Sequence, residues 1–246
     1  MAEDVELQLN AGLKARDYRD AYAREGYVQV PNLLEPKSAE ALAEVLERHT
    51  PWALTYSNPT PHPTRLDEAE LARLGGEVVG RRVGEVLQTA SEGFAYMYLG
   101  YDMIDAHLQG RDPGHPIHLL TELLNSRAFI DFCHGVIAGE APTKTEAHAT
   151  LYRPGDFLNL HDDSYKGQRL AAYTLGFTRR WRADWGGQLL FHDATGEIVR
   201  GLQPAFNTLT LFRTPRAHSV AQVATYAAWP RISVVGWLRG DPIGQL

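Results

Sequence analysis

The spacing of apolar residues changes at about residue 147 of this 246-residue chain. Before that point apolar residues recur mostly at the spacing of an α-helix, with one short alternating stretch, GYVQVPNLL, that is typical of a strand. The pattern predicts helices over 5–26, 35–49 and 126–139. The first part of the chain is therefore expected to be mainly helical.

From residue 147 onward, apolar and polar residues alternate with period two, and turn sequences such as RPGD, DATG and RTPR interrupt them. The predicted strands are 147–153, 157–161, 169–178, 187–192, 197–202, 207–213, 218–225 and 231–239. Short strands in this number indicate a sandwich or barrel, for which a jelly roll is the usual arrangement. Because no linker interrupts the chain, we expect one domain over 1–246. It is mainly β with flanking α: a double-stranded β-helix (jelly roll) over 147–246, braced by the mainly helical region 1–146.

Composition and charge narrow the class of protein. The net charge is −6 and the basic residues are scattered, which argues against a direct nucleic-acid partner. No apolar run approaches the roughly 20 residues that span a bilayer, and the acidic N-terminus lacks the apolar core of a secretory signal. Cys133, the lone cysteine, lies in the apolar pattern of the third helix and is expected in the core. We therefore expect a cytoplasmic protein with no membrane partner.

The segment LYRPGDFLNLHDDSYKGQR (151–169) ends a predicted strand with an imidazole and two carboxylates. On a strand, residues i and i+2 share a face, so His161 and Asp163 point one way and Asp162 the other. His218 begins a later strand. Two imidazoles and one carboxylate inside a small barrel form the facial triad typical of non-haem Fe(II). The motif His-x-Asp is weak alone, since a solvated turn has the same composition.

A candidate anion site accompanies this triad. Arg231 and Ser233 share one face of the last predicted strand, beside the strand of His218 if the two form a hairpin. A guanidinium inside a barrel requires an anion, which the far carboxylate of a metal-chelating dicarboxylate would supply. Tyr152, on the strand that leads to His161, can donate its hydroxyl to the same carboxylate.

Taken together, these motifs resemble the Fe(II)/2-oxoglutarate-dependent dioxygenases of the prolyl 4-hydroxylase type, and the similarity runs over most of the chain. It is carried by AREGYVQVPNLLEPKSAEAL, LLNSRAFIDFCHGVIAG, LYRPGDFLNLHDD, RRWRADWGGQLLFHD, FNTLTLFRT, HSV and RISVVGWLRG, in that order. The segment RLAAYTLGF and the later WGGQLLF are most similar to the branch that hydroxylates a proline of a ribosomal protein.

The resemblance implies a catalytic site and its cofactors. His161, Asp163 and His218 would ligate Fe(II), and Arg231 would bind the distal carboxylate of 2-oxoglutarate with Tyr152 and Ser233 assisting. O2 would be the second co-substrate, and ascorbate a stimulating reductant. The expected reaction hydroxylates an unactivated C–H bond and releases succinate and CO2.

The substrate expected from the resemblance is a prolyl residue of a peptide or protein, such as a basic translation-related protein. Three alternatives remain: a hydroxylase of a free amino acid or other small metabolite, a catalytically silent cupin-like binding module, and a Zn(II) hydrolase with the same ligands. The basic and aromatic segment TRRWRADW (178–185) is expected at the mouth of the barrel, and SNPTPHPTR (57–65) is a candidate lid. The oligomeric state is not indicated.

The chain departs from the family pattern at two points. The family often has a second tyrosine near the end of the strand that starts at Arg169, where this sequence has Gly176 and Phe177. The stretch from His218 to Arg231 is also longer than usual, which leaves Arg216 and Arg239 as alternative carboxylate anchors.

Overall fold

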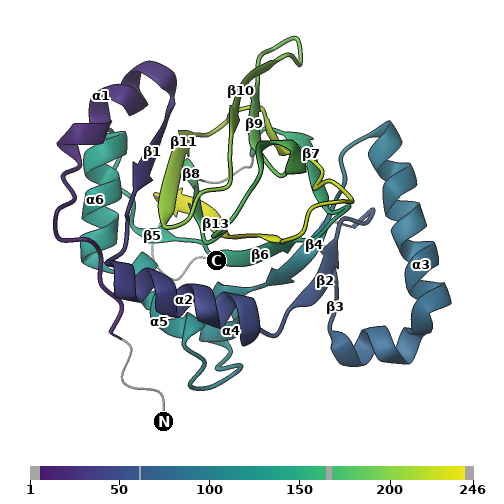
Figure 1. The fold of residues 1–246 in the computed structure, drawn as a ribbon. Coiled ribbons are helices and arrows are strands. Elements are labelled where there is room, and N and C mark those ends of the chain that lie inside the picture. Colours follow the sequence, from purple (N-terminus) through teal and green to yellow (C-terminus); the bar gives the residue numbers. More distant parts are fainter. Residues whose placement is uncertain (1–5, 61, 165–167, 242–246) are drawn as a thin grey trace.

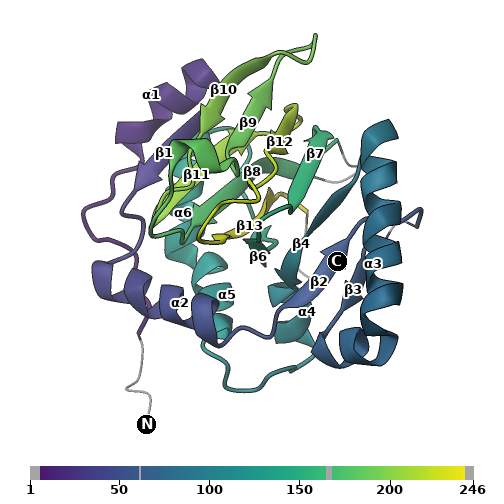
Figure 2. The same cartoon turned by 45° about the vertical axis from the view of Figure 1, so that its right-hand side comes forward.

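The architecture is a single antiparallel sheet that curls into a barrel and carries helices on its outside (Figures 1 and 2). A computed structural model describes residues 6–60, 62–164 and 168–241. Its helices are α1 (Arg16–Glu25), α2 (Pro36–Arg48), α3 (Glu68–Glu92), α4 (Met103–Leu108), α5 (Ile117–Leu124) and α6 (Arg127–Ile137), with a 3-10 turn at Ala183–Trp185. None of these helices is both long and apolar enough to cross a bilayer.

The strands confirm the predicted jelly roll. They are β1 (Tyr27–Pro31), β2 (Ala53–Tyr56), β3 (Thr64–Leu66), β4 (Tyr96–Tyr101), β5 (Lys144–Thr145), β6 (His148–Tyr152), β7 (Phe157–His161), β8 (Arg169–Gly176), β9 (Leu189–His192), β10 (Ile198–Leu202), β11 (Thr208–Arg213), β12 (His218–Val220) and β13 (Arg231–Arg239). Their order is β1-β11-β8-β13-β6-β4-β7-β12-β9-β10, so β4 joins one half of the barrel to the other. Each predicted strand after residue 147 is present, the one that begins at His218 being shorter than expected.

One prediction about strand neighbours is wrong. The strands of His218 and Arg231 do not form a hairpin: β12 pairs with β7 and β9, whereas β13 lies between β6 and β8. Between β12 and β13 the chain crosses from one half of the barrel to the other, so these two strands are not neighbours. The loop 221–230 makes this crossing, and its Val223 amide bonds to the Asp156 carbonyl instead of extending β12.

The N-terminal region contains more β structure than its sequence pattern indicates. Strands β2, β3 and β4 were not predicted, and they extend the sheet alongside β6 and β7. The first helix is also shorter than predicted, because Leu9 forms an isolated bridge with Leu34 and the Asn10 side chain accepts from the Gly12 amide. The spaced apolar residues before Arg16 thus pack against the main core without forming a helix.

The main core lies between the barrel and the helices of the N-terminal region. Phe129 of α6 packs edge-on against Tyr173 of β8, with ring centroids 6.1 Å apart. Cys133 is fully buried in the same cluster, as predicted. The Ser126 side chain caps α6 by accepting from the Phe129 amide. A second, smaller cluster holds α3 against β2, β3 and β4, on the opposite side of the barrel from α1 and α6 (Figure 1).

Candidate metal and co-substrate site

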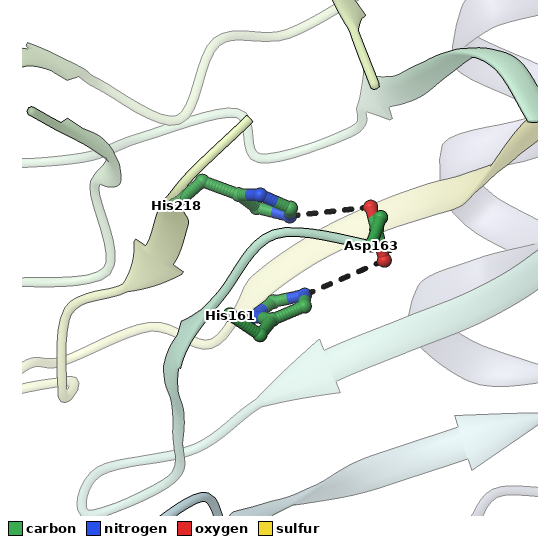
Figure 3. Close-up of side chains that lie close together, drawn as sticks. All are labelled: His161, Asp163 and His218. Carbon is green, nitrogen blue, oxygen red and sulfur yellow. Dashed lines mark ion pairs between the residues drawn. The ribbon is translucent and has the colours of Figure 1, made fainter. Parts of the chain in front are cut away.

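The three predicted ligands meet at one end of the barrel. His161 ends β7 and His218 begins β12, and the two residues lie opposite each other in the antiparallel pairing of these strands. Asp163 Oδ1 lies 3.7 Å from His161 Nε2, and its Oδ2 lies 3.5 Å from His218 Nε2 (Figure 3). One ligand atom from each of the three residues falls within 4.8 Å of the others, a grouping compact enough to hold a metal ion.

A turn, not strand alternation, brings Asp163 to the same side as His161. Strand β7 ends at His161, and Asp163 adopts a positive φ of 60°. Asp162 between them is exposed, and its carboxylate accepts from the Ser164 amide. The predicted sidedness of these residues is therefore observed, but the local conformation is an Asx-type turn that exploits the tolerance of aspartate for the left-handed region.

Backbone carbonyls fix the tautomers of both histidines. His161 Nδ1 lies 2.9 Å from the Asn159 carbonyl oxygen, and His218 Nδ1 lies 2.7 Å from that of Arg216. A carbonyl only accepts, so each Nδ1 carries the proton and each Nε2 keeps its lone pair toward Asp163. Burial and the neighbouring His161 lower the pKa of His218 to about 4, against the opposing effect of Asp163. His218 is therefore neutral at pH 7, the form that binds a metal ion.

A cavity of about 380 Å³ opens beside the triad. Arg231 and Tyr152 line it together with His161, Asp163 and His218, so the predicted anchor and the predicted ligands face the same space. Arg231 is opposite Tyr152 in the β13–β6 pairing, and its guanidinium carbon lies 5.0 Å from the Tyr152 ring centroid. The guanidinium thus stands at the cavity wall, supported by an aromatic face.

Arg231 is buried without a counter-charge. Only 5% of the residue is exposed, and among the described residues no carboxylate pairs with it. Its Nε has no hydrogen-bond partner, while Nη1 donates to Ser233 Oγ over 3.1 Å. Burial lowers the pKa of Arg231, although an arginine remains cationic at neutral pH. A buried cation of this kind requires an anion, and a ligand carboxylate would satisfy it.

Ser233 supports Arg231 from behind. It does not line the main cavity; it lines a small hollow next to it, which Arg231 also borders. Its hydroxyl lies 3.0 Å from Thr150 Oγ1 and accepts the Arg231 bond. Ser233 therefore orients the guanidinium, and its expected assistance in binding 2-oxoglutarate stays a prediction.

The two alternative anchors are engaged elsewhere. Arg216 lies over the Phe191 ring at 4.2 Å and donates to the Glu25 carbonyl, which ties the end of α1 to the barrel. Arg239 pairs with Glu146 and with Asp241. Neither lines the cavity, which leaves Arg231 as the anchor that the geometry favours.

Neither candidate position for the missing second tyrosine, Gly176 or Phe177, contributes a side chain to the cavity. A Cβ on Gly176 would lie 2.0 Å from the Ala205 carbonyl oxygen, and Phe177 is fully buried in the main core cluster. Tyr173, three residues earlier, does line the cavity, but its hydroxyl donates to the Glu146 carbonyl. No tyrosine hydroxyl of β8 is therefore available for a second contact.

Several cavity residues were missed by the sequence analysis. Phe94, Tyr96 and Tyr98 occupy alternate positions at β4 and line the cavity, with neighbouring ring centroids 5.7 and 5.5 Å apart. Their spacing of two residues in GFAYMY is a strand signal that could have been found. His148 and Trp237 also line the cavity, with ring centroids 5.7 Å apart. They meet because β6 and β13 are neighbours, which the sequence pattern does not indicate.

The segment TRRWRADW does not line the cavity, and its expected position at the mouth of the barrel stays a prediction. Arg179 pairs with Glu40 and Glu47 of α2, and Arg182 pairs with Asp184 in its own segment. Trp181 packs against Trp185, and none of these residues lines the cavity. From the candidate lid, Pro63 and Arg65 do line it, while Pro61 lies outside the described residues.

Comparison with known proteins agrees with this geometry. Residues 147–239 match the family model described as "2OG-Fe(II) oxygenase superfamily". This segment is similar to 2OG-Fe(II) oxygenase domains. The match spans β6 to β13 and therefore the three candidate ligands and Arg231. The family implies Fe(II), 2-oxoglutarate and O2, and the donors found here suit that set.

One curated relative is named as a prolyl hydroxylase. Prolyl 3-hydroxylase sudestada1 of Drosophila melanogaster is 28% identical over 107 residues, which are 39% of this chain. The chain matches only 20% of the length of that curated relative. The activity of the whole protein is therefore taken up as a proposal below.

Solved structures share the fold. A Pseudomonas putida prolyl-4-hydroxylase has a TM-score of 0.59 at 19% identity, covering 92% of this chain and 99% of that one. A Trichoplax adhaerens prolyl hydroxylase, solved with a hypoxia inducible factor peptide fragment, has a TM-score of 0.61 at 14% identity, covering 92% and 89%. At these identities the likeness establishes the fold alone, for the barrel and the N-terminal helices together.

Proposed function

We propose that the protein is an Fe(II)- and 2-oxoglutarate-dependent dioxygenase that hydroxylates a prolyl residue of a protein or peptide, releasing succinate and CO2. The observation that carries this proposal is that one cavity contains both a set of metal donors and a buried cation that requires an anion. The triad of His161, Asp163 and His218 offers three donors to a divalent metal, and Arg231 requires an anion in the same space.

Each residue has a role that follows from its surroundings. His161, Asp163 and His218 would hold Fe(II), which supplies the oxidative chemistry when bound. Arg231 would pair with the far carboxylate of 2-oxoglutarate, since its guanidinium fork matches a carboxylate. The Tyr152 hydroxyl has no hydrogen-bond partner among the described residues and lies beside that guanidinium, so it can donate to the same carboxylate. Burial raises the pKa of Tyr152, which keeps the hydroxyl protonated.

A protein or peptide substrate is favoured over a small molecule by the rim of the cavity. Phe94 lines the cavity, packs 5.4 Å from the His161 ring and is 49% exposed. A small metabolite would fit inside without using this exposed ring, whereas a chain passing over the rim would cover it. The relatives named as prolyl hydroxylases support the same choice, and the branch acting on a ribosomal protein remains our proposal within it.

Anaerobic titration with Fe(II) and then 2-oxoglutarate tests the metal site. We expect the weak visible charge-transfer band of the chelate to appear only with both ligands present. Admission of O2 should then release succinate even without substrate. Absence of the band and of succinate would refute the enzyme and leave a cupin-like binding module.

Mass spectrometry of cell protein incubated with the enzyme, Fe(II) and 2-oxoglutarate tests the substrate. We expect an added 16 Da on a proline of a peptide, absent when His161→Ala replaces the native enzyme. If no peptide gains oxygen while free amino acids stimulate succinate release above the substrate-free rate, the free-amino-acid alternative is supported instead.

A further inference from the structure

Asp163 is the candidate ligand that the sheet positions least. Both histidines belong to paired strands, whereas Asp163 follows the end of β7 at a positive φ. A cation contacts its carboxylate: Arg169 Nη1 lies 3.5 Å from Asp163 Oδ1. Both side chains are largely buried, with 17% and 7% exposed, so solvent screens this pair little.

The Arg169 guanidinium is itself held in place. Its central carbon lies 3.6 Å from the centroid of a Trp237 ring, a stacked arrangement that fixes the plane of the fork. On the other side, its Nη2 lies 3.9 Å from Glu146 Oε2, and Glu146 also pairs with Arg239. Strands β8 and β13, which carry Arg169 and Trp237, are neighbours in the sheet. The sheet thus fixes the guanidinium that touches Asp163.

We propose that Arg169, stacked on Trp237, is a positioning residue that orients the Asp163 carboxylate for the metal. This inference rests on the proposed function. A ligating carboxylate outside regular structure gains its orientation from its outer partners, and removal of such partners usually weakens metal binding 10- to 100-fold. A guanidinium beside the carboxylate also withdraws negative charge from it, so Arg169 affects the electronic character of the site as well as its geometry.

Arg169→Met tests the proposal, with Arg65→Met as the matched control. Arg65 also lines the cavity, but it pairs with Asp102 and not with Asp163. We expect Arg169→Met to weaken Fe(II) binding about 10- to 100-fold and to shift the charge-transfer band of the Fe(II)–2-oxoglutarate chelate. Its KM for 2-oxoglutarate at saturating iron should stay near the native value, because Arg231 is intact. Arg65→Met should keep native Fe(II) affinity and band position.

Two further variants separate orientation from folding. Arg169→Lys keeps the charge but loses the planar fork, and Trp237→Phe keeps Arg169 but weakens its stacking. Both should show intermediate losses of Fe(II) affinity, which keeps the test decisive if Arg169→Met does not fold.

Native Fe(II) affinity and band position in these Arg169 and Trp237 variants would overturn the proposal. An equal loss in Arg65→Met would overturn it too, since the effect would then not depend on contact with Asp163. Failure of the proposed function is distinguishable, because the native protein itself would then show neither band nor succinate release.

Discussion

At the scale of single residues, two charged groups in the cavity have opposite surroundings. Asp163 has imidazoles on two sides and Arg169 on a third, and the Arg169 guanidinium is the group that compensates its negative charge before any metal binds. Arg231 has no acidic partner within the described ranges and rests on a tyrosine ring and a serine hydroxyl. The first arrangement suits a metal ligand and the second suits an anion receptor.

The pair Asp163→Ala and Asp162→Ala separates a ligand from its neighbour. We expect Asp163→Ala to weaken Fe(II) binding by more than ~100-fold, since loss of a ligand exceeds the usual loss of an outer partner. Asp162 is exposed and its carboxylate accepts from the Ser164 amide within the turn, so Asp162→Ala should stay within about twofold of native affinity. Calorimetric titration of Fe(II) under anaerobic conditions measures both. Equal losses would contradict the assigned ligand set.

Arg231→Met should raise the KM for 2-oxoglutarate and leave Fe(II) affinity unchanged. Loss of hydrogen bonds to a charged group costs about 1.5–3 kcal/mol, which corresponds to roughly 10- to 100-fold in KM. Arg231→Lys should lose less, because the charge remains without the fork. Steady-state succinate release measures the change. An unchanged KM would show that another residue binds the far carboxylate of 2-oxoglutarate.

His148 gives the stability a pH dependence. Burial, together with Arg65 and Arg169, lowers its pKa from 6.5 to about 4. The folded state therefore favours neutral His148, and the contribution is present above pH 6.5 and lost as the pH falls toward 4. A shift of this size corresponds to at most about 3 kcal/mol. Urea unfolding from pH 7 to 4 should show a steeper loss of stability for the native protein than for His148→Gln, and parallel curves would refute this origin.

At the scale of elements, the packing of β8 explains why this chain has Gly176 where similar proteins often have a second tyrosine. This strand lies between β11 and β13, and Gly176 at its end pairs with Thr208 on one side and Ser233 on the other. The Ala205 carbonyl approaches so closely that only glycine fits. The packing of this strand end therefore excludes the second tyrosine.

Gly176→Ala should destabilise the protein although alanine is the smallest possible change. The added methyl would meet a backbone carbonyl, and overpacking of this kind costs about 2 kcal/mol or more. For a protein of this size that lowers Tm by roughly 4–8 °C. The matched control is Gly80→Ala in α3, where a Cβ meets nothing within 4 Å and helix propensity favours alanine. A native Tm for Gly176→Ala would contradict the close approach.

At the scale of the whole molecule, one core joins the N-terminal helices to the barrel. The main cluster contains Leu42, Phe129 and Cys133 from the first part of the chain, and Tyr173 and Val234 from the second. Since each part buries its apolar face against the other, we propose that residues 1–246 form a single domain in which neither part is stable alone.

Thermal or urea unfolding should accordingly show one cooperative transition. Far-ultraviolet circular dichroism follows the α-helices, which in the described part of the chain all lie before residue 147. Near-ultraviolet signals follow the tryptophans, four of which lie after residue 180. The two probes should give coincident curves. Separate transitions would show that the helical region and the barrel are independent units.

The sequence by itself determined the local features of this protein. Alternation after residue 147 fixes the strands of the jelly roll, because period two is a property of each strand alone. Likewise, Ser126 caps α6 and Cys133 is buried, as their local patterns indicate.

Only the tertiary structure decided which of these strands are neighbours and what faces the cavity. It separates β12 from β13, places Tyr152 opposite Arg231, and brings Arg169 and Trp237 to Asp163. It also adds β4, whose aromatic residues line the cavity. These relations depend on pairing between segments far apart in the chain, which the spacing within any one segment cannot encode.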